Sequence, residues 1–290
     1  LFEEVPDSVR WLRERPDPHF RIYARGVHAP THAVFLRGWR NGFDTSGYHE
    51  MLRDALPAAY GLYGLHGHSY PTREMYQLVR DSDRVAIGFF LDLMGVRYVL
   101  EEASLPYESR DGERLAYENR HVRILEREDP MPMAFLAGGA RWAPDDEGFG
   151  LVREGMFDPG RGALLPLVSR EYRDVGGASG EVEIVRWEGE EVILRAPTGT
   201  GDLLVINQQF VPGWRAKVDG APAQVLRANA VQTAVLLPHD WGKDRDVLLR
   251  YDPDSWRIGK RMTWAGAAAW FALAGSWILR RRVRPRRTAA

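Results

Sequence analysis

The sequence predicts an α+β protein with a mixed α/β N-terminal domain, an antiparallel β-sandwich of jelly-roll-like type and one C-terminal transmembrane helix. Three observations support this class. Helix and strand patterns mix through residues 1–130, strand-length segments separated by turns recur through residues 131–255, and residues 262–279 carry no charged side chain. A basic tail at residues 280–290 completes the chain.

Helix starts and strand patterns define the predicted α/β domain. Asp7 or Ser8 can cap a short helix that carries Val9 and Leu12. The change from helix to strand at Gly95 is typical of an α/β connection, because glycine readily adopts the left-handed conformation that ends a helix. The expected helices cover residues 45–56, 72–79 and 83–94, and the expected strands cover residues 20–23 and 96–100.

Beyond residue 131, short apolar segments alternate with turn residues, which is typical of an antiparallel sandwich. The pairs Pro212-Gly213 and Asp219-Gly220 are two of these turns, because their residues favour the backbone angles of tight turns. No helix is expected between residue 131 and the C-terminal one. The predicted strands cover residues 133–136, 182–187, 191–196, 203–210, 214–218, 231–237 and 247–251.

The eighteen uncharged residues 262–279 predict a membrane anchor. A helix of roughly 18 to 20 residues rises about 1.5 Å per residue and nearly matches a hydrocarbon core of about 30 Å. Six arginines follow within residues 280–287, against three basic residues just before the segment. Basic residues gather on the cytoplasmic side, so we expect the tail there and residues 1–255 on the extracytoplasmic side. The many alanines and glycines favour packing within a larger helix bundle.

Composition excludes several functions. The chain carries 39 basic and 40 acidic residues, and nine of the basic ones lie in residues 256–290, which leaves 30 against 40 before that point. Such an acidic region argues against nucleic acid as a partner. The absence of cysteine excludes both disulfides and thiolate metal sites. No cofactor is expected.

The sequence begins at Leu1, without a methionine or a signal peptide, although most of it is expected outside the cytoplasm. We therefore expect it to be the C-terminal part of a longer, multi-pass protein of the cell membrane. Its partners would be membrane lipid and an upstream transmembrane bundle of the same protein.

Five segments carry a resemblance to a known family, namely residues 91–100 (LDLMGVRYVL), 131–136 (MPMAFL), 157–165 (FDPGRGALL), 210–220 (FVPGWRAKVDG) and 251–259 (YDPDSWRIG). In this order they resemble the C-terminal part of the bacterial YfhO-type membrane proteins, large polytopic proteins of the GT-C glycosyltransferase architecture. The resemblance runs from about Val5 to the last helix. It departs at Pro132-Met133-Ala134, where the family commonly has proline, arginine and alanine, and at residues 238–246.

The resemblance implies an extracytoplasmic domain that follows a bundle of many membrane helices. It also implies sugar transfer from a polyprenyl-phosphate donor to a cell-envelope glycan, with a catalytic carboxylate in a loop upstream of this chain. No catalytic residue is therefore assigned within the chain. The alternative is a non-catalytic, membrane-tethered scaffold domain that binds glycan or protein.

Trp214 and Arg215 are the candidate sugar-contacting residues, since a tryptophan face stacks on C–H groups while a guanidinium bonds hydroxyls. The competing interpretation is structural: Trp214 plugs the sandwich between two turns. It is favoured because one tryptophan without clustered polar partners is not a site.

Histidines and acidic pairs are weaker candidates. His66 and His68 could share one face of a strand with Glu74 nearby, but a loop with solvated histidines is the favoured interpretation and no metal site is assigned. Paired carboxylates serve glycoside hydrolysis, yet neighbouring acids usually point apart or into solvent. The acidic pairs are Glu101-Glu102, Asp145-Asp146 and Glu190-Glu191.

Overall fold

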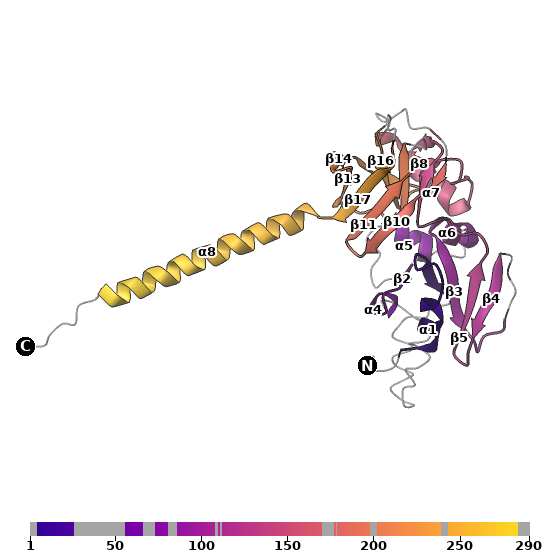
Figure 1. Cartoon of the computed structure of the whole chain (residues 1–290), viewed down its shortest axis with the longest axis horizontal. Coiled ribbons are helices and arrows are strands. Elements are labelled where there is room, and N and C mark those ends of the chain that lie inside the picture. Colours follow the sequence, from indigo (N-terminus) through magenta and orange to yellow (C-terminus); the bar gives the residue numbers. More distant parts are fainter. Residues whose placement is uncertain are drawn as a thin grey trace, which may run out of the picture.

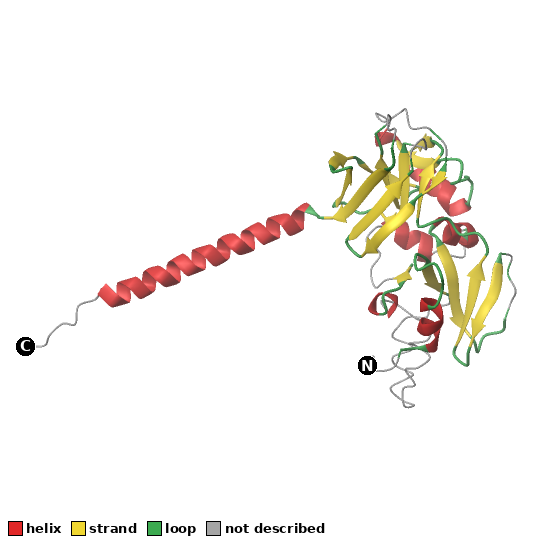
Figure 2. Cartoon of the chain, viewed as in Figure 1, coloured by secondary structure: helices red, strands yellow, loops and turns green. Residues whose placement is uncertain are grey.

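The structure, a computed structural model, describes residues 5–25, 56–65, 73–80, 86–107, 110, 112–169, 177, 179–197, 202–238 and 243–283. It is mixed α+β, with several antiparallel sheets and a C-terminal helix, as the sequence predicts. Figure 1 shows two packed parts and one long helix, α8 (Asp254–Val283), which leaves the upper part as a single rod. Figure 2 shows that strands dominate both parts.

The N-terminal part is built on a mixed sheet, here called the first sheet. Strand β1 pairs in parallel with β2 and β3, and β5 pairs antiparallel with β3 and β4. The strands in spatial order are β2 (Tyr63–Gly64), β1 (Arg21–Ala24), β3 (Val96–Glu102), β5 (Val122–Arg127) and β4 (Glu113–Glu118). The helices are α1 (Asp7–Arg13), α4 (Leu56–Ala59), α5 (Arg73–Arg80) and α6 (Ile87–Leu93).

Helices cover both faces of the first sheet, because alternate strand residues point to opposite faces. Val9 and Leu12 of α1 pack on one face, in a cluster that includes Ile22, Leu100 and Ile124. Helices α5 and α6 pack on the other face, where Tyr23, Val99 and Leu125 belong to a second cluster. The predicted helices at residues 72–79 and 83–94 and both predicted strands therefore match described elements, whereas residues 45–55 lie outside the described residues.

Two antiparallel five-stranded sheets pack face to face and form the sandwich-like second part. One consists of β10 (Glu183–Glu188), β11 (Glu191–Ala196), β17 (Arg245–Tyr251), β13 (Trp214–Val218) and β14 (Ala221–Ala223). The other consists of β15 (Val225–Ala228), β16 (Gln232–Leu236), β12 (Leu203–Gln209), β6 (Ala134–Ala137) and β9 (Gly180–Glu181). All seven strands predicted after residue 131 are present within a few residues of their expected bounds, and the jelly-roll connection stays a prediction.

Apolar side chains fill the space between these two sheets. Leu194 and Leu249 come from one sheet and Leu136, Leu204 and Val235 from the other, and all five are fully buried. The alternation is clear in β13, where Trp214, Ala216 and Val218 are buried and the two residues between them are exposed. This alternation is the pattern that made the strands visible in the sequence.

One helix contradicts the sequence prediction. Residues 131–255 were expected to hold no helix before the C-terminal one, but α7 (Asp145–Glu154) is helical for ten residues. Two glycines inside it obscured the helical pattern, although three acidic residues in its first turn and Gly155 after its end are ordinary helix boundary signals. Next to it lie a parallel pair of strands, β7 (Ala140–Ala143) and β8 (Ala163–Pro166), and the 3₁₀ turn η2 (Leu167–Ser169).

A buried polar cluster joins the two parts. The Arg21 guanidinium donates to the carbonyl oxygens of Met94, at 2.8 Å, and of Asn207. The Gln232 amide donates to Leu93 O at 2.9 Å and to the Asn207 side chain. Burial lowers the pKa of Arg21 to about 10, so its charge persists at neutral pH. These groups come from both parts, and their buried polar atoms are mostly hydrogen-bonded. We call this contact between the two parts the seam, and its hydrogen bonds hold the parts in one relative position.

Helix α8 confirms the predicted helix at residues 262–279 but not its predicted span. Among the residues that the structure describes, none of the helices combines the length and the apolar character needed to cross a membrane.

Candidate functional site

Trp214 lies in the core between the two sandwich sheets. Its side chain is 8% exposed, its ring packs on Tyr251 at 5.2 Å, and its indole N–H donates to Gln209 O at 3.2 Å. A ring that is buried to this extent offers no free platform to a sugar. The structure therefore places this residue where the packing interpretation expects it, and a sugar contact stays a prediction.

Arg215 points out of the sandwich and bonds the start of α8. Its Nη2 lies 2.7 Å from Asp254 Oδ1, and its Nε donates to Asp252 O at 3.2 Å. Arg257, one turn into α8, also lies 3.5 Å from Asp254 Oδ1. These bonds join β13 to the first turn of α8, so we call this region the sandwich–helix joint.

Gly213 brings the two chain segments of the joint into close contact. Its φ is +120°, a conformation that L side chains rarely adopt. A Cβ at this position would lie 2.8 Å from Pro253 Cβ and 3.0 Å from Tyr251 Cε2. Its carbonyl accepts a hydrogen bond from Asp252 N at 2.9 Å. Residues 210–220 and 251–259 thus meet at one place.

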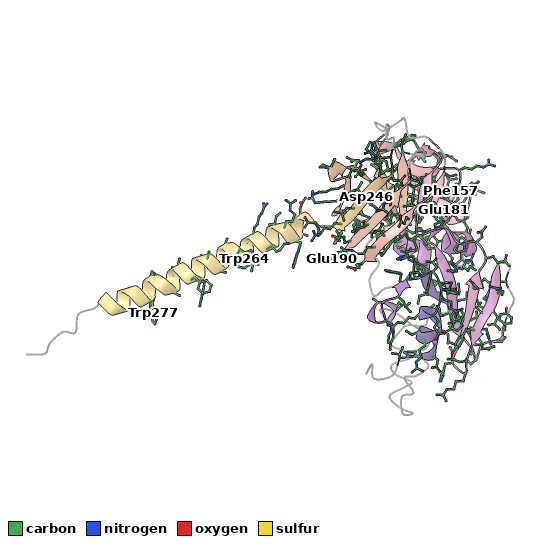
Figure 3. All side chains as sticks on the ribbon, viewed as in Figure 1. Phe157, Glu181, Glu190, Asp246, Trp264 and Trp277 are labelled. Atoms are coloured by element: carbon green, nitrogen blue, oxygen red, sulfur yellow. The ribbon has the colours of Figure 1, made fainter. Side chains whose placement is uncertain are left out.

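The uncharged segment of α8 is exposed along its length. Large apolar side chains are 55–75% exposed, among them Trp264 near one end and Trp277 near the other (Figure 3). Basic residues bracket the segment, with Arg257, Lys260 and Arg261 before it and three consecutive arginines after Leu279. Soluble monomers rarely expose so large a contiguous apolar surface.

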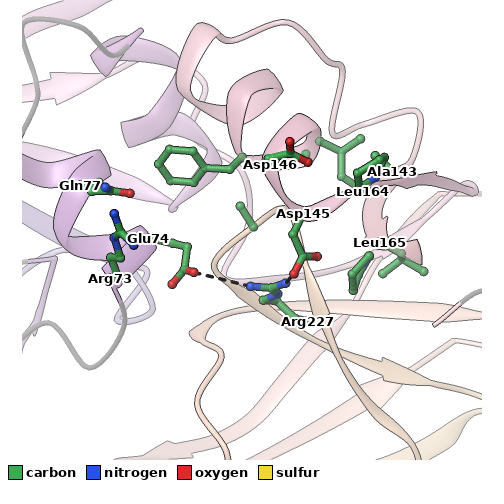
Figure 4. Close-up of a pocket in the computed structure, with 14 residues that line it drawn as sticks. Arg73, Glu74, Gln77, Ala143, Asp145, Asp146, Leu164, Leu165 and Arg227 are labelled. Atoms are coloured by element: carbon green, nitrogen blue, oxygen red, sulfur yellow. Dashed lines mark ion pairs between the residues drawn. The ribbon is translucent and has the colours of Figure 1, made fainter. Parts of the chain in front are cut away.

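A pocket of about 190 Å³ lies where the two parts meet, lined by α5, the first turns of α7, β8 and the end of β15. Figure 4 shows Arg227 between two carboxylates that come from different parts. Its guanidinium lies 2.6 Å from Asp145 Oδ2 and 4.0 Å from Glu74 Oε1. Arg73, Gln77 and Asp146 complete the polar lining. We call this cavity the seam pocket.

The floor of the seam pocket is apolar and rigid. Leu164 and Leu165 of β8 are buried, and the Leu164 backbone exchanges two hydrogen bonds with Asn229, each 2.8 Å long. Asn229 and Ala230 both have positive φ and form the turn between β15 and β16. The turn therefore holds two elements in place, namely the apolar floor formed by β8 and strand β15, which carries Arg227. Sequence reasoning noticed Asp145-Asp146 and Glu74 but missed Arg73, Gln77 and Arg227, which carry no local motif.

The acidic pairs have different environments. Glu101 is buried and bonds Arg123 and Arg25, whereas its neighbour Glu102 is exposed, so the two point apart as adjacent strand residues do. Glu191 pairs with Arg186 on the sandwich surface. The solvated interpretation is therefore wrong for Glu101, because arginines at inward positions of neighbouring strands neutralise it.

Glu101 belongs to a chain of ion pairs along the first sheet. Glu113 bonds both Arg25, at 2.6 Å, and Arg127, at 3.0 Å. Burial alone lowers the pKa of Arg25, but the hydrogen bond and charge of Glu113, together with Glu101, raise it overall. In order along the sheet the members of this ion-pair chain are Asp92, Arg127, Glu113, Arg25, Glu101, Arg123 and Glu118. Each charged side chain in this ion-pair chain is paired with one of opposite sign. The ion-pair chain is therefore a structural feature and not an exposed reactive site.

The candidate metal residues His66 and His68, like His28, His32 and His49, lie outside the described residues. Glu74, the carboxylate that was considered as a third ligand, lines the seam pocket. Within the part of the chain that the structure describes, no three His, Asp or Glu side chains are grouped to hold a metal ion.

Comparison with known proteins adds no relative: no family model matches the chain, and neither a curated protein nor a solved structure is found to match it.

Proposed function

We propose that the chain is the extracytoplasmic C-terminal portion of a polytopic membrane protein similar to the YfhO-type, GT-C glycosyltransferases. In this proposal the full protein transfers a sugar from a polyprenyl-phosphate donor to an envelope polymer. The chemistry takes place on residues upstream of this chain. The two packed parts described above help to position the acceptor, while α8 holds them at the membrane.

The single observation that carries the proposal is the exposed, uncharged segment of α8. Its 18 residues, from Met262 to Leu279, cover about 27 Å at about 1.5 Å per residue. Basic side chains stand at both ends, where the headgroups of a bilayer would lie, and the larger cluster marks the cytoplasmic side. The proposal places α8 among other membrane helices, because its alanines and glycines allow close helix packing.

The sandwich–helix joint supports a positioning role. A flexible linker would leave the orientation of a tethered domain undefined. Here β17 ends at Tyr251, α8 begins at Asp254, and Arg215 bonds both sides of the junction. These contacts give α8 a defined direction as it leaves the sandwich. In this proposal that direction sets the height and orientation of the seam pocket above the membrane.

Vesicle flotation tests the membrane attachment. The full chain, transferred from detergent to vesicles of phosphatidylethanolamine and phosphatidylglycerol, should float with the lipid and stay there after a carbonate wash. The variant Leu273→Arg places a charge near the middle of the uncharged segment, which costs about 2.5–3.5 kcal/mol on insertion scales and should lower the membrane partition constant roughly a hundredfold.

The matched control is Val185→Arg, which adds the same charge at an exposed site on β10. It should float like the unaltered chain. If the unaltered chain stays in the aqueous fraction, or if Leu273→Arg floats as well as the control, the proposed attachment is wrong.

The second candidate function is a non-catalytic, membrane-tethered scaffold that binds glycan or protein. The seam pocket favours it, because that pocket combines polar groups without an assigned nucleophile. The two functions differ in what precedes Leu1 in the gene: many hydrophobic spans with an acidic residue in the first external loop favour the transferase, and a single signal peptide favours the scaffold. Loss of envelope glycan modification in a strain that lacks the gene would also support the transferase.

A further inference from the structure

The seam pocket has a chemistry to which the proposed function assigns no ligand. Its polar lining contains three carboxylates and two guanidiniums, which come from α5, α7 and β15. Arg227 is already neutralised by Asp145, at 2.6 Å, with Glu74 beyond it at 4.0 Å. The pocket is therefore nearly balanced in charge, and no single sign dominates it.

Three of its polar side chains have no partner among the described residues. Arg73 and Gln77 on α5 and Asp146 on α7 take part in no hydrogen bond or ion pair there, and Figure 4 shows them around the cavity. Arg73 offers only donors, Asp146 offers only acceptors, and Gln77 offers both. A ligand that satisfies all three must both donate and accept hydrogen bonds.

The balance of charge excludes strongly charged ligands. An anion would approach Asp145, Asp146 and Glu74, and a cation would approach Arg73 and Arg227, so either meets a repelling group within the cavity. A neutral hydroxylated molecule meets neither. Its hydroxyl groups donate to the carboxylates and accept from the guanidiniums and the amide.

The volume of the pocket and its apolar floor narrow the class of ligand further. The volume of about 190 Å³ equals roughly six waters at about 30 Å³ each, which suits one compact molecule and not a long chain segment. Leu164, Leu165 and Phe149 line the cavity and offer an apolar surface to the C–H groups of a sugar ring.

We propose that the seam pocket binds one neutral saccharide residue, held by Arg73, Gln77 and Asp146 against the apolar floor. The proposal rests on the proposed function only in that the sugar would be part of the envelope polymer. Because one wall belongs to the N-terminal part and the others to the sandwich part, the bound sugar would also strengthen the seam between them.

Saturation-transfer NMR on the full chain in detergent tests the proposal, with glucose, galactose and N-acetylglucosamine as neutral probes and glucuronate and glucosamine as charged ones. At least one neutral sugar should bind at millimolar concentration, and the charged ones should bind roughly tenfold more weakly. Hydrogen exchange should slow in α5 and in the first turn of α7. The measurement needs no vesicle, so its failure leaves the flotation result unaffected.

Two variants with matched controls locate the site. Asp146→Asn and Arg73→Gln should each weaken binding roughly tenfold, because each removes a charge-assisted hydrogen bond. Glu147→Gln, the next residue along α7, pairs with Arg141, and Arg161→Gln alters an exposed pair with Asp158; neither lines the pocket, so both should bind normally. The proposal is overturned if no neutral sugar binds, if a charged probe binds most tightly, or if the pocket variants bind as well as their controls.

Discussion

The first sheet and the sandwich keep their charged residues in opposite places. In the first sheet, inward positions of neighbouring strands carry arginine and glutamate, and the side chain of Glu113 is only 4% exposed. In the sandwich, the space between the sheets holds apolar side chains, and ion pairs such as Arg195–Asp246 and Arg245–Asp219 stand at the rim.

This difference predicts different sensitivities. A buried ion pair that loses one partner leaves the other charge uncompensated in a poorly solvated site, whereas an exposed pair loses little. The first sheet should therefore depend on complete charge pairing, and the sandwich should depend on the shape of its apolar core. The following substitutions test this contrast from the largest expected effect to the smallest.

Glu113→Ala should be the most destabilising change. It removes the carboxylate that Arg25 and Arg127 share and leaves each with one remaining carboxylate partner, Glu101 and Asp92, so two positive charges stay under-compensated in a largely buried site. The free energy of unfolding should fall by about 3 kcal/mol, at the lower end of the cost of breaking a buried ion pair. Urea unfolding of the full chain in detergent measures the loss, and hydrogen exchange should rise first in β3, β4 and β5.

The control for this prediction lies at the exposed end of the same ion-pair chain. Glu118 is 43% exposed and pairs with Arg123, so Glu118→Gln should cost only about 0–1 kcal/mol. Equal losses for the two variants would show that position along the ion-pair chain does not matter and would contradict the proposed contrast.

Leu249→Ala should be nearly as damaging, through a cavity and not through charge. Leu249 is fully buried between the sheets, where it faces Val192 on β11 and Ala216 on β13 along the strand register. Large-to-small changes in such sites cost about 2–5 kcal/mol. Hydrogen exchange should rise first in the sandwich strands. Val185→Ala, on the exposed side of β10, should lower the free energy of unfolding by less than about 0.5 kcal/mol. If it costs as much as Leu249→Ala, the loss does not come from the apolar core.

Gly213→Ala tests the joint between the sandwich and α8. The alanine would adopt a rarely allowed backbone conformation, which costs about 1–3 kcal/mol, and its Cβ would collide with Pro253. Protection of the Asp252 amide, which donates to Gly213 O, should fall.

Gly220→Ala separates the effect of backbone strain from the effect of the collision with Pro253. Gly220 also has a positive φ, of +84°, but a Cβ there meets no atom within 4 Å. It should lose stability through backbone strain alone and keep the Asp252 amide protected. If both variants expose that amide equally, the contact between Gly213 and Pro253 does not hold the joint.

The same contrast explains which elements the sequence predicts well. Strand β13 alternates apolar and polar residues, β11 carries three consecutive apolar residues, and the Asp219-Gly220 pair turns β13 into β14 as expected. Strands β4 and β5 were not predicted, because arginine and glutamate occupy inward positions where the pattern requires apolar residues. A charged residue usually indicates an exposed position, but it can be buried where a neighbouring strand supplies the opposite charge. That pairing arises from the fold and cannot be read from the local sequence pattern.

The seam pocket was not predictable for a related reason. Its lining comes from α5, α7, β8 and β15, so residues as distant as Arg73 and Arg227 meet only through the fold. One local signal existed, since a run of acidic residues followed by glycine ten positions later is typical of a short helix. Recognising α7 would have placed Asp145 and Asp146 at a helix start, but not their partners.

The smallest predicted effect is a pH dependence at the sandwich rim, where Asp219 closes the β13–β14 hairpin. A hydrogen bond from Arg245, 2.6 Å from Oδ2, and a second from the Asp246 N–H, at 3.0 Å, hold the pKa of Asp219 below its ordinary value of about 3.9. A lowered folded pKa means that the unfolded chain binds the proton more readily. The stabilisation is therefore complete above the unfolded pKa and is lost as the pH falls through the folded one.

Carbon-detected NMR of the Asp219 carboxyl should show a midpoint below the ordinary aspartate value of about 3.9. In Arg245→Gln the midpoint of Asp219 should move up toward the ordinary value, while the hairpin persists because the Asp246 N–H still bonds the carboxylate. An unchanged midpoint would assign the shift to the turn backbone alone. Because Asp219 is solvent-screened, its loss of charge in acid should perturb this hairpin without unfolding the sandwich.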